Sequence, residues 1–217
     1  MLDRMSWLSR LGFVAATPGR GGDEAALLAR ALGGDEAALA LLYRRESGPV
    51  YRYALALCGD EAAALDAMQE AFTQLLQRPE GFEPGRGTLG AYLAGIARHQ
   101  LLARWREARR LVQQAGGRDL DDLPDDREDG PDRPGSHGPE APATDALLVR
   151  TQDTAALWAA IRRLPWSQRE ALVLVDLQER PYDDAARVAG VSTDVLRTRL
   201  HRARHRLAQL LGAGDPR

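Results

Sequence analysis

Apolar residues recur at steps of three and four along most of this chain, the spacing that places them on one face of an α-helix. One such stripe runs through residues 60–77 and predicts burial of Leu65, Met68, Phe72 and Leu75. A longer helix is expected after Thr88, which suits its N-cap, and its inward residues are Leu89, Leu93, Ile96, Ala97 and Leu101. The pattern therefore predicts an all-α protein.

Glycine and proline divide these helices from one another. Asp35 is expected to cap a helix that is interrupted near Gly48-Pro49 and resumes to Leu57, before Gly59. A Gly/Pro-rich loop, residues 81–90, cannot continue a helix and separates the next two. In the second half, residues 153–164 form a helix that Pro165 ends, and Ser167 with Glu170 predicts a capping box for its successor.

Residues 182–207 have the layout of a DNA-reading helix-turn-helix. Gly190 suits the left-handed position that ends a helix, and Ser192 or Thr193 can cap the next one. In that second helix an apolar stripe faces the core, formed by Leu196, Leu200, Ala203, Leu207 and Leu210. The opposite face carries Asp194, Arg197, Thr198, His201, Arg202 and His205. An isolated basic amphipathic helix would look similar, but the glycine turn and cap favour a helix that enters the major groove.

A second basic helix lies in the first half of the chain. The helix after Thr88 carries Arg98, His99, Arg104, Arg106, Arg109 and Arg110 on its outer side and end, against one acid, Glu107. A basic helix beside a loop with an aromatic residue is typical of single-strand capture, because arginines neutralise phosphates and an unpaired base can stack or enter a pocket. Trp105 could stack on DNA, but its helical spacing favours a place in the core.

Composition predicts two small helical domains joined by a disordered acidic linker. The segment 112–150 combines Gly, Pro and Asp with few aliphatic residues, as unfolded linkers do. It separates a domain at 23–111 from a domain at 151–211, and residues 1–22 form an N-terminal extension. The net charge is only −2, with 31 acids against 29 basic residues, because linker acids offset the arginine-rich helices.

Several function classes find no support in the sequence. No phosphate-binding loop, nucleophile elbow or zinc-ligand spacing is present, so we expect a binding protein rather than an enzyme, with no metal, cofactor or small-molecule substrate. The longest apolar run near the N-terminus is too short for a signal peptide or membrane span. The lone Cys58 cannot form an internal disulfide, which suits a cytoplasmic protein.

Two stretches resemble the extracytoplasmic-function class of bacterial RNA polymerase sigma factors, in the sigma-70 family. Residues 162–204 are similar to sigma region 4 in the Leu164-Pro165 step, the run Gln168 to Leu172, Tyr182, and the run Arg199 to Arg204. The DAMQEAF run at 66–72 resembles a signature of sigma region 2. Asp194 and Val195 depart from the family, which often has Gly-Thr there, so the promoter sequence is left open.

The resemblance implies roles for particular residues. Contacts to the minus-35 promoter element would come from Arg197, Thr198 and His201, with Arg199, Arg202 and Arg204 nearer phosphates or the core. Opening of the minus-10 element would use Phe82, Thr88, Tyr92, His99, Arg98, Arg104 and Arg106. Docking on core RNA polymerase would use Asp66, Gln69 and Glu70, a stripe that taken alone reads as a solvated helix face.

The expected function is therefore to bind core RNA polymerase and promoter DNA and to direct transcription initiation. The resemblance also allows an anti-sigma protein as partner. One alternative is a sigma-like adaptor that binds an anti-sigma protein without initiating transcription. Another is a conventional regulator with a single helix-turn-helix, which the DAMQEAF match disfavours.

Overall fold

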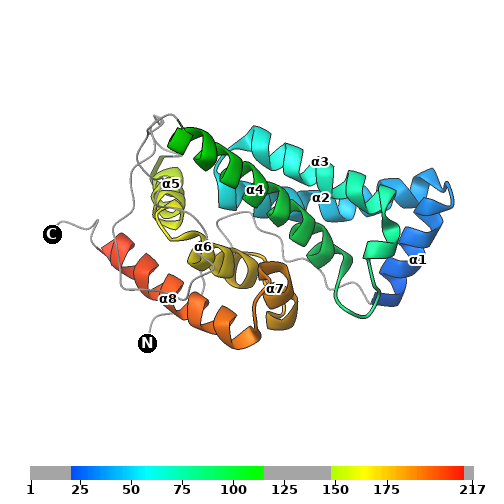
Figure 1. Ribbon diagram of the computed structural model, residues 1–217. Helices are drawn as coiled ribbons and strands as arrows, with labels where there is room; N and C mark the ends of the chain where they lie inside the picture. The colour runs from blue at the N-terminus through cyan, green and yellow to red at the C-terminus, as the bar shows by residue number, and fades with distance from the viewer. Residues whose placement is uncertain (1–20, 115–147, 213–217) are drawn as a thin grey trace.

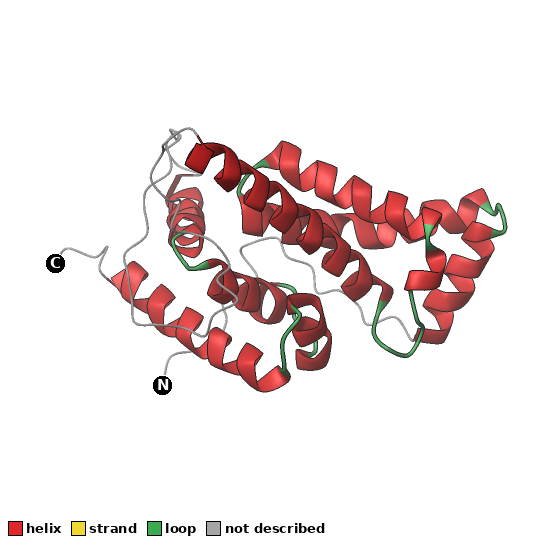
Figure 2. Cartoon of the chain, in the orientation of Figure 1, coloured by secondary structure: helices red, strands yellow, loops and turns green. Residues whose placement is uncertain are grey.

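The computed structural model describes residues 21–114 and 148–212, and within these ranges every regular element is a helix (Figure 1, Figure 2). The predicted all-α class is thereby confirmed. The predicted extension up to residue 20 and linker residues 115–147 lie outside the described ranges. Residues 112–114 and 148–150 are helical, so the flanking helices extend into both ends of the predicted linker.

The first domain consists of α1 (Gly21–Leu32), α2 (Glu36–Cys58), α3 (Glu61–Gln77), the 3-10 turn η2 (Pro79–Gly81) and α4 (Leu89–Gln114). Polar caps set its helix ends. The Asp35 carboxylate accepts the Ala38 N–H at 3.0 Å, and Asp60 does the same for Ala63 at 2.7 Å. Gly59, with φ 70°, ends α2 in the left-handed region.

The interruption predicted at Gly48-Pro49 is wrong, because α2 runs through Pro49 without a break. Proline removes one backbone donor from a helix, which costs stability. The residues that follow are nevertheless held by tertiary packing, since the side chains of Val50, Tyr53 and Leu57 are buried. Burial of this apolar face offsets the local preference for a break.

The buried face of α3 also differs from the prediction. Met68, Phe72 and Leu75 are buried as expected, whereas Leu65 is 43% exposed. Its predicted place in the core is taken by the buried residues Ala64, Ala67 and Ala71. Small alanine side chains let α3 approach α2 and α4 closely, and this close packing rotates Leu65 toward solvent.

The second domain contains α5 (Leu148–Arg162), α6 (Trp166–Leu172), one π-helical turn η3 (Val173–Leu177), α7 (Tyr182–Ala189) and α8 (Thr193–Gly212). Pro165 separates α5 from α6, as predicted. The expected stripe of α8 is buried at Leu196, Leu200, Ala203 and Leu207, and Leu210 is partly buried.

The capping box predicted for Ser167 and Glu170 is wrong. Helix α6 begins directly after Pro165, and no side chain caps it. Glu170 is completely buried and accepts hydrogen bonds from Tyr53 and Arg98 of the first domain. Packing between the domains therefore determines the position of this carboxylate, rather than the end of its own helix.

The two domains pack against each other in one continuous hydrophobic core. Figure 1 shows α6 and α7 beside α2 and α4, and α7 contacts α4 near its N-terminal part. At the other end of α4, the half-buried ring of Trp105 lies 5.8 Å from the ring of Trp166. Trp105 thus contacts a buried ring at the domain interface but is itself only half-buried and outside the buried core, so the expectation of a core position holds only in part.

Candidate nucleic-acid interface

The turn between α7 and α8 has helix-turn-helix geometry. Gly190 adopts φ 68° at the end of α7, and the Val191 N–H bonds the Ala186 carbonyl at 3.0 Å. The Ser192 hydroxyl accepts the Val195 N–H at 3.3 Å, so Ser192 caps α8, as one of the two expected residues. Because the apolar stripe of α8 packs inward, its polar stripe faces solvent.

Arg197, Thr198, His201 and Arg202, all predicted to contact DNA, are exposed on this outer face of α8. The Arg197 guanidinium donates to Asp194 at 3.0 Å and lies 5.5 Å from the centre of the Tyr182 ring. These two neighbours restrict its orientation near the N-terminal end of α8. The Thr198 hydroxyl donates to the Asp194 carbonyl at 3.0 Å.

Two further arginines of α8 lie differently. Arg199 is half-buried, and Arg204 binds the buried carboxylate of Asp176 through two hydrogen bonds, at 2.8 and 2.5 Å. These bonds raise the pKa of Arg204, which stays fully charged. The structure thus places Arg204 as a link between α8 and η3, with its side chain 51% exposed.

A half-open pocket of about 320 Å³ lies between the loop before α4 and the first turns of that helix. Its wall includes four residues that the sequence predicts for minus-10 capture: Phe82, Thr88, Tyr92 and His99. The volume is at the lower end of the range for small-molecule pockets, which suits a single unpaired base. Arg187 of α7 completes the wall from the second domain.

Packing determines how these pocket residues are presented. The Phe82 ring is buried, and its centroid lies 5.7 Å from that of the Tyr92 ring, so Phe82 packs against Tyr92. His99 is exposed, and partial burial together with Arg98 and Arg106 lowers the pKa of its imidazole. A lowered pKa favours the neutral imidazole, which can donate from one ring nitrogen and accept at the other.

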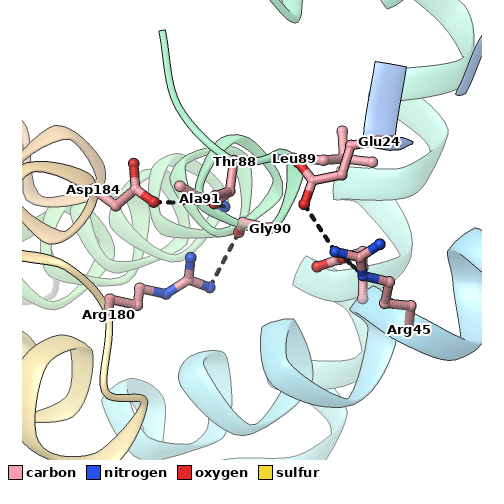
Figure 3. A network of polar contacts seen from close by, with 9 residues as sticks. Glu24, Arg45, Thr88, Leu89, Gly90, Ala91, Arg180 and Asp184 are labelled. Carbon is pink, nitrogen blue, oxygen red and sulfur yellow. Dashed lines mark hydrogen bonds and ion pairs between the residues drawn. The ribbon is translucent and has the colours of Figure 1, made fainter. Parts of the chain in front are cut away.

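The start of α4 is held by a polar network that the sequence predicts only in part (Figure 3). The Thr88 hydroxyl caps the helix by accepting the Ala91 N–H at 3.2 Å, as predicted. Glu24 of α1 accepts the Leu89 N–H at 2.8 Å and pairs with Arg45 at 3.0 Å. From the second domain, Arg180 donates to the Gly90 carbonyl at 3.2 Å. No local pattern marks Glu24 or Arg180, because their partners are distant in sequence.

The remaining basic residues of α4 differ in whether they form an ion pair and in how far they are exposed to solvent. Arg104 bonds Asp66 of α3 at 2.8 Å, and both side chains are more than half exposed. Arg106 is exposed, and Arg110 pairs with Glu107 at 3.0 Å. Arg98 points into the domain interface, while the side chain of Arg109 lies outside the described residues. The exposed arginines continue from the pocket toward the C-terminal half of α4.

The predicted polymerase-docking residues, Asp66, Gln69 and Glu70, are exposed on α3. Two leucines of the same helix, Leu65 and Leu76, are also exposed, at 43% and 40%. Across residues 21–114 and 148–212, no cluster of His, Cys, Asp or Glu could hold a metal ion, and no helix could span a membrane.

Comparison with known proteins matches both halves of the chain. The Sigma-70 region 2 family matches residues 42–111, and the Sigma-70, region 4 family matches residues 154–207. The chain is 32% identical over 166 residues to the ECF RNA polymerase sigma factor EcfG of Rhodopseudomonas palustris, covering 75% of this chain and 81% of that protein. The chain belongs to the ECF sigma factors. Its first domain is hereafter called region 2 and its second region 4.

Other comparisons agree with this membership. The sigma factor is 29% identical over 181 residues to the ECF RNA polymerase sigma factor SigE of Mycolicibacterium smegmatis, covering 82% of this chain and 64% of SigE. The solved structure of the sigma factor RpoE from Bartonella quintana, in complex with the anti-sigma factor NepR, has the same fold. Its TM-score is 0.60 at 22% identity, over 82% of this chain and 98% of RpoE.

Proposed function

We propose that this sigma factor binds core RNA polymerase, recognises the minus-35 and minus-10 promoter elements, and directs transcription initiation. The observation that carries the proposal is the occurrence, in one ECF chain, of two separate basic surfaces suited to different forms of DNA. One is the outer face of α8, and the other is the pocket at the start of α4.

The α8 surface is suited to double-stranded DNA at the minus-35 element. A helix of this width fits the major groove, where arginine can donate twice to guanine and hydroxyl or imidazole groups can bond other base edges. Arg197, Thr198 and His201 are our base-reading residues. Arg202 is the phosphate-binding candidate, with half-buried Arg199 beside it. Arg204 has a supporting role through its pair with Asp176.

The α4 pocket is suited to an unpaired base of the minus-10 element. Tyr92 provides an aromatic surface, and neutral His99 and the Thr88 hydroxyl provide polar groups for the base edge. Arg104 and Arg106 extend the basic surface along the helix for the phosphate backbone. Capture of an unpaired base would favour the melted promoter without any chemical catalysis, so we assign no enzymatic role.

The α3 stripe is our docking surface for core RNA polymerase. Asp66, Gln69 and Glu70 are exposed there and flanked by exposed leucines. An anti-sigma protein is the second proposed protein partner, since RpoE has been solved in complex with the anti-sigma factor NepR. We place the working protein in the cytoplasm, where polymerase and promoter DNA are found.

Run-off transcription tests this proposal directly. Purified core RNA polymerase would be incubated with this protein and a pool of promoter fragments from the source genome. We expect discrete start sites that depend on the protein. Stable binding to the polymerase without any transcript would contradict the initiation role and favour the sigma-like adaptor, and absence of polymerase binding would contradict both.

A further inference from the structure

The N-terminal end of α8 carries an acid between its cap and its basic residues. Asp194 lies in the first turn of the helix, and its side chain is 90% exposed. Its charge suits the positive end of the helix dipole, but Ser192 already caps α8. The same charge repels DNA phosphates at the end of a recognition helix that approaches the base edges. Asp194 therefore opposes DNA binding unless a donor on a base compensates for its charge.

The two oxygens of the Asp194 carboxylate have different surroundings. Oδ1 accepts a hydrogen bond from the Arg197 guanidinium at 3.0 Å, one turn later in the same helix. Among residues 21–114 and 148–212, no hydrogen bond uses Oδ2. The Thr198 hydroxyl, on the same face, donates to the backbone carbonyl of Asp194 instead. Because an ionised carboxylate accepts at both oxygens, Oδ2 remains available to a donor on DNA.

Arg197 has a second neighbour in Tyr182, the first residue of α7. Its guanidinium carbon lies 5.5 Å from the centre of the Tyr182 ring. Figure 1 shows α7 next to the N-terminal end of α8, and the two helices are in contact. Hydrogen bonding to Asp176 is the main cause of the raised pKa of Arg204, and Tyr182 adds to it. The Tyr182 side chain therefore interacts with two arginines, which restricts its own movement and that of Arg197.

Asp194 and Arg197 together present an acceptor and a donor to the major groove. Arginine donates to the O6 and N7 atoms of guanine, and a carboxylate accepts from the N4 amino group of cytosine. Guanine and thymine present only acceptors at this edge, so either base would be repelled by a carboxylate. The exposed pair contributes little to folding, because water and salt screen it, and both groups can therefore be used on DNA.

We propose that Asp194 is a specificity-determining residue of the minus-35 contact, which selects cytosine beside the guanine read by Arg197. This inference rests on the proposed function of α8 and deepens it. Oδ1 orients Arg197 toward the guanine, and Oδ2 accepts the amino group of the cytosine. Tyr182 is a positioning residue, since it acts through Arg197. The negative charge lowers affinity for DNA in general and is compensated only where a cytosine amino group faces Oδ2.

The test measures base preference, because a purely electrostatic role of Asp194 would leave that preference unchanged. Core RNA polymerase loaded with the full chain selects from a pool of duplexes randomised at the minus-35 element, and sequencing gives the preference at each position. Asp194→Ala removes the carboxylate, and Asp194→Asn keeps its shape but removes its charge. The matched control is Asp183→Ala, which removes the same charge from an exposed position in the first turn of α7.

We expect Asp194→Ala to lose about tenfold of the preference for cytosine at one position, and roughly threefold of the preference for guanine beside it. Asp194→Asn should accept thymine as well as cytosine, because its amide also donates. Asp183→Ala should keep the original preferences. Original preferences in both Asp194 variants, whatever their affinity for DNA, would overturn the proposal. Circular dichroism checks that each variant folds.

The positioning role of Tyr182 is tested through its ring. Tyr182→Leu removes the aromatic face and should lower the preference for guanine about threefold, with the preference for cytosine retained. Tyr182→Phe keeps that face and should restore the preference for guanine. A guanine preference in Tyr182→Leu equal to that of the original protein would overturn this role.

Selection by the original protein separates this inference from the proposed function. If it enriches a defined minus-35 sequence in which no cytosine preference depends on Asp194, only this inference is refuted. If it enriches no sequence at all, α8 does not read the minus-35 element, and the proposed function and the inference fail together.

Discussion

Arginines that look alike in the sequence differ in their surroundings within α8. Arg197 pairs with Asp194, whose side chain is 90% exposed, whereas Arg204 pairs with Asp176, whose side chain is 8% exposed. Exposed ion pairs contribute about 0–1 kcal/mol, because water and salt screen them. A buried carboxylate that loses its partner costs more, because its desolvation is no longer compensated. Arg204 therefore serves stability, and Arg197 remains available for DNA.

Arg204→Ala should lower the free energy of unfolding by roughly 1–3 kcal/mol, since it leaves Asp176 buried without this partner. Arg197→Ala should change it by less than about 0.5 kcal/mol. Urea unfolding measures both. For binding to minus-35 duplex DNA the two variants should rank in reverse. Arg197→Ala should weaken binding by roughly 1–3 kcal/mol, more than Arg204→Ala does. Equal loss of stability in the two variants would contradict the assignment of Arg204 to stability and Arg197 to DNA binding.

Glu46 makes the stability of region 2 depend on pH. Burial raises the pKa of Glu46, and Arg45 offsets this only in part. The folded protein therefore binds this proton more tightly than the unfolded chain does. Protonated Glu46 contributes fully to stability below the pKa that it has in the unfolded chain, near 4.5. This contribution is lost as pH rises through the higher pKa of Glu46 in the folded protein.

Glu46→Gln removes this titration, so the stability of the original protein relative to the variant should fall as pH rises from about 4 to 7. Urea midpoints of both proteins across that range measure the difference. The exposed Glu36→Gln is the control and should give a difference that changes little with pH. An opposite slope for Glu46→Gln would show that attraction by Arg45 outweighs burial.

Helices α3 and α4 of region 2 each combine a buried apolar face with an exposed polar or basic face. In α3 the buried alanines allow close packing, and this packing turns Asp66, Gln69 and Glu70 outward. In α4 the same division places a buried stripe opposite arginines. The exposed face of α3 can therefore be altered with little effect on the core.

Changing Asp66 and Glu70 together to Arg should abolish association with core RNA polymerase, because it reverses the charge of the docking stripe. Loss of the exposed Asp66–Arg104 pair should cost less than about 1 kcal/mol, so the fold should persist. Co-purification with tagged polymerase measures the association. Changing Glu36 and Glu61 to Arg makes the same total charge change elsewhere, and normal co-purification of both variants would refute the docking role.

The charge of the whole molecule conceals its DNA-binding surfaces. A net charge of −2 alone would indicate a poor ligand for DNA, yet exposed arginines are concentrated along α4 and α8. Every arginine that neutralises a phosphate releases condensed counterions, so DNA affinity should fall steeply with salt concentration. The local charge of each helix therefore predicts the behaviour with DNA better than the total does.

Arg106→Ala should make the dependence of log affinity on log salt shallower, by about 0.7 for single-stranded DNA, with the preferred sequence unchanged. Titrations of a minus-10 oligonucleotide at several salt concentrations measure the slope. Tyr92→Ala is the contrasting variant, since it removes an aromatic contact and should leave the slope unchanged. A changed slope for Tyr92→Ala alone would contradict this division between phosphate and base contacts.

Features that depend on neighbours along the chain could be predicted from the sequence alone. Helical spacing, the caps Asp35 and Thr88, and the turn at Gly190 were all predictable, because each involves contacts within a few residues. The two motifs also identified the family. Placement of the predicted residues on exposed faces of α3 and α8 followed from the same periodicity.

Features that depend on partners distant in sequence emerged only from the packing of the folded chain. It kept α2 continuous through Pro49, exposed Leu65, and moved Glu170 from an expected cap to a buried pair with Arg98. These outcomes reflect close packing and the cost of burying charge, which act between residues far apart in the chain. The packing of region 4 beside the pocket at the start of α4 belongs to the same class, since a pattern along one helix cannot specify which surface another domain will contact.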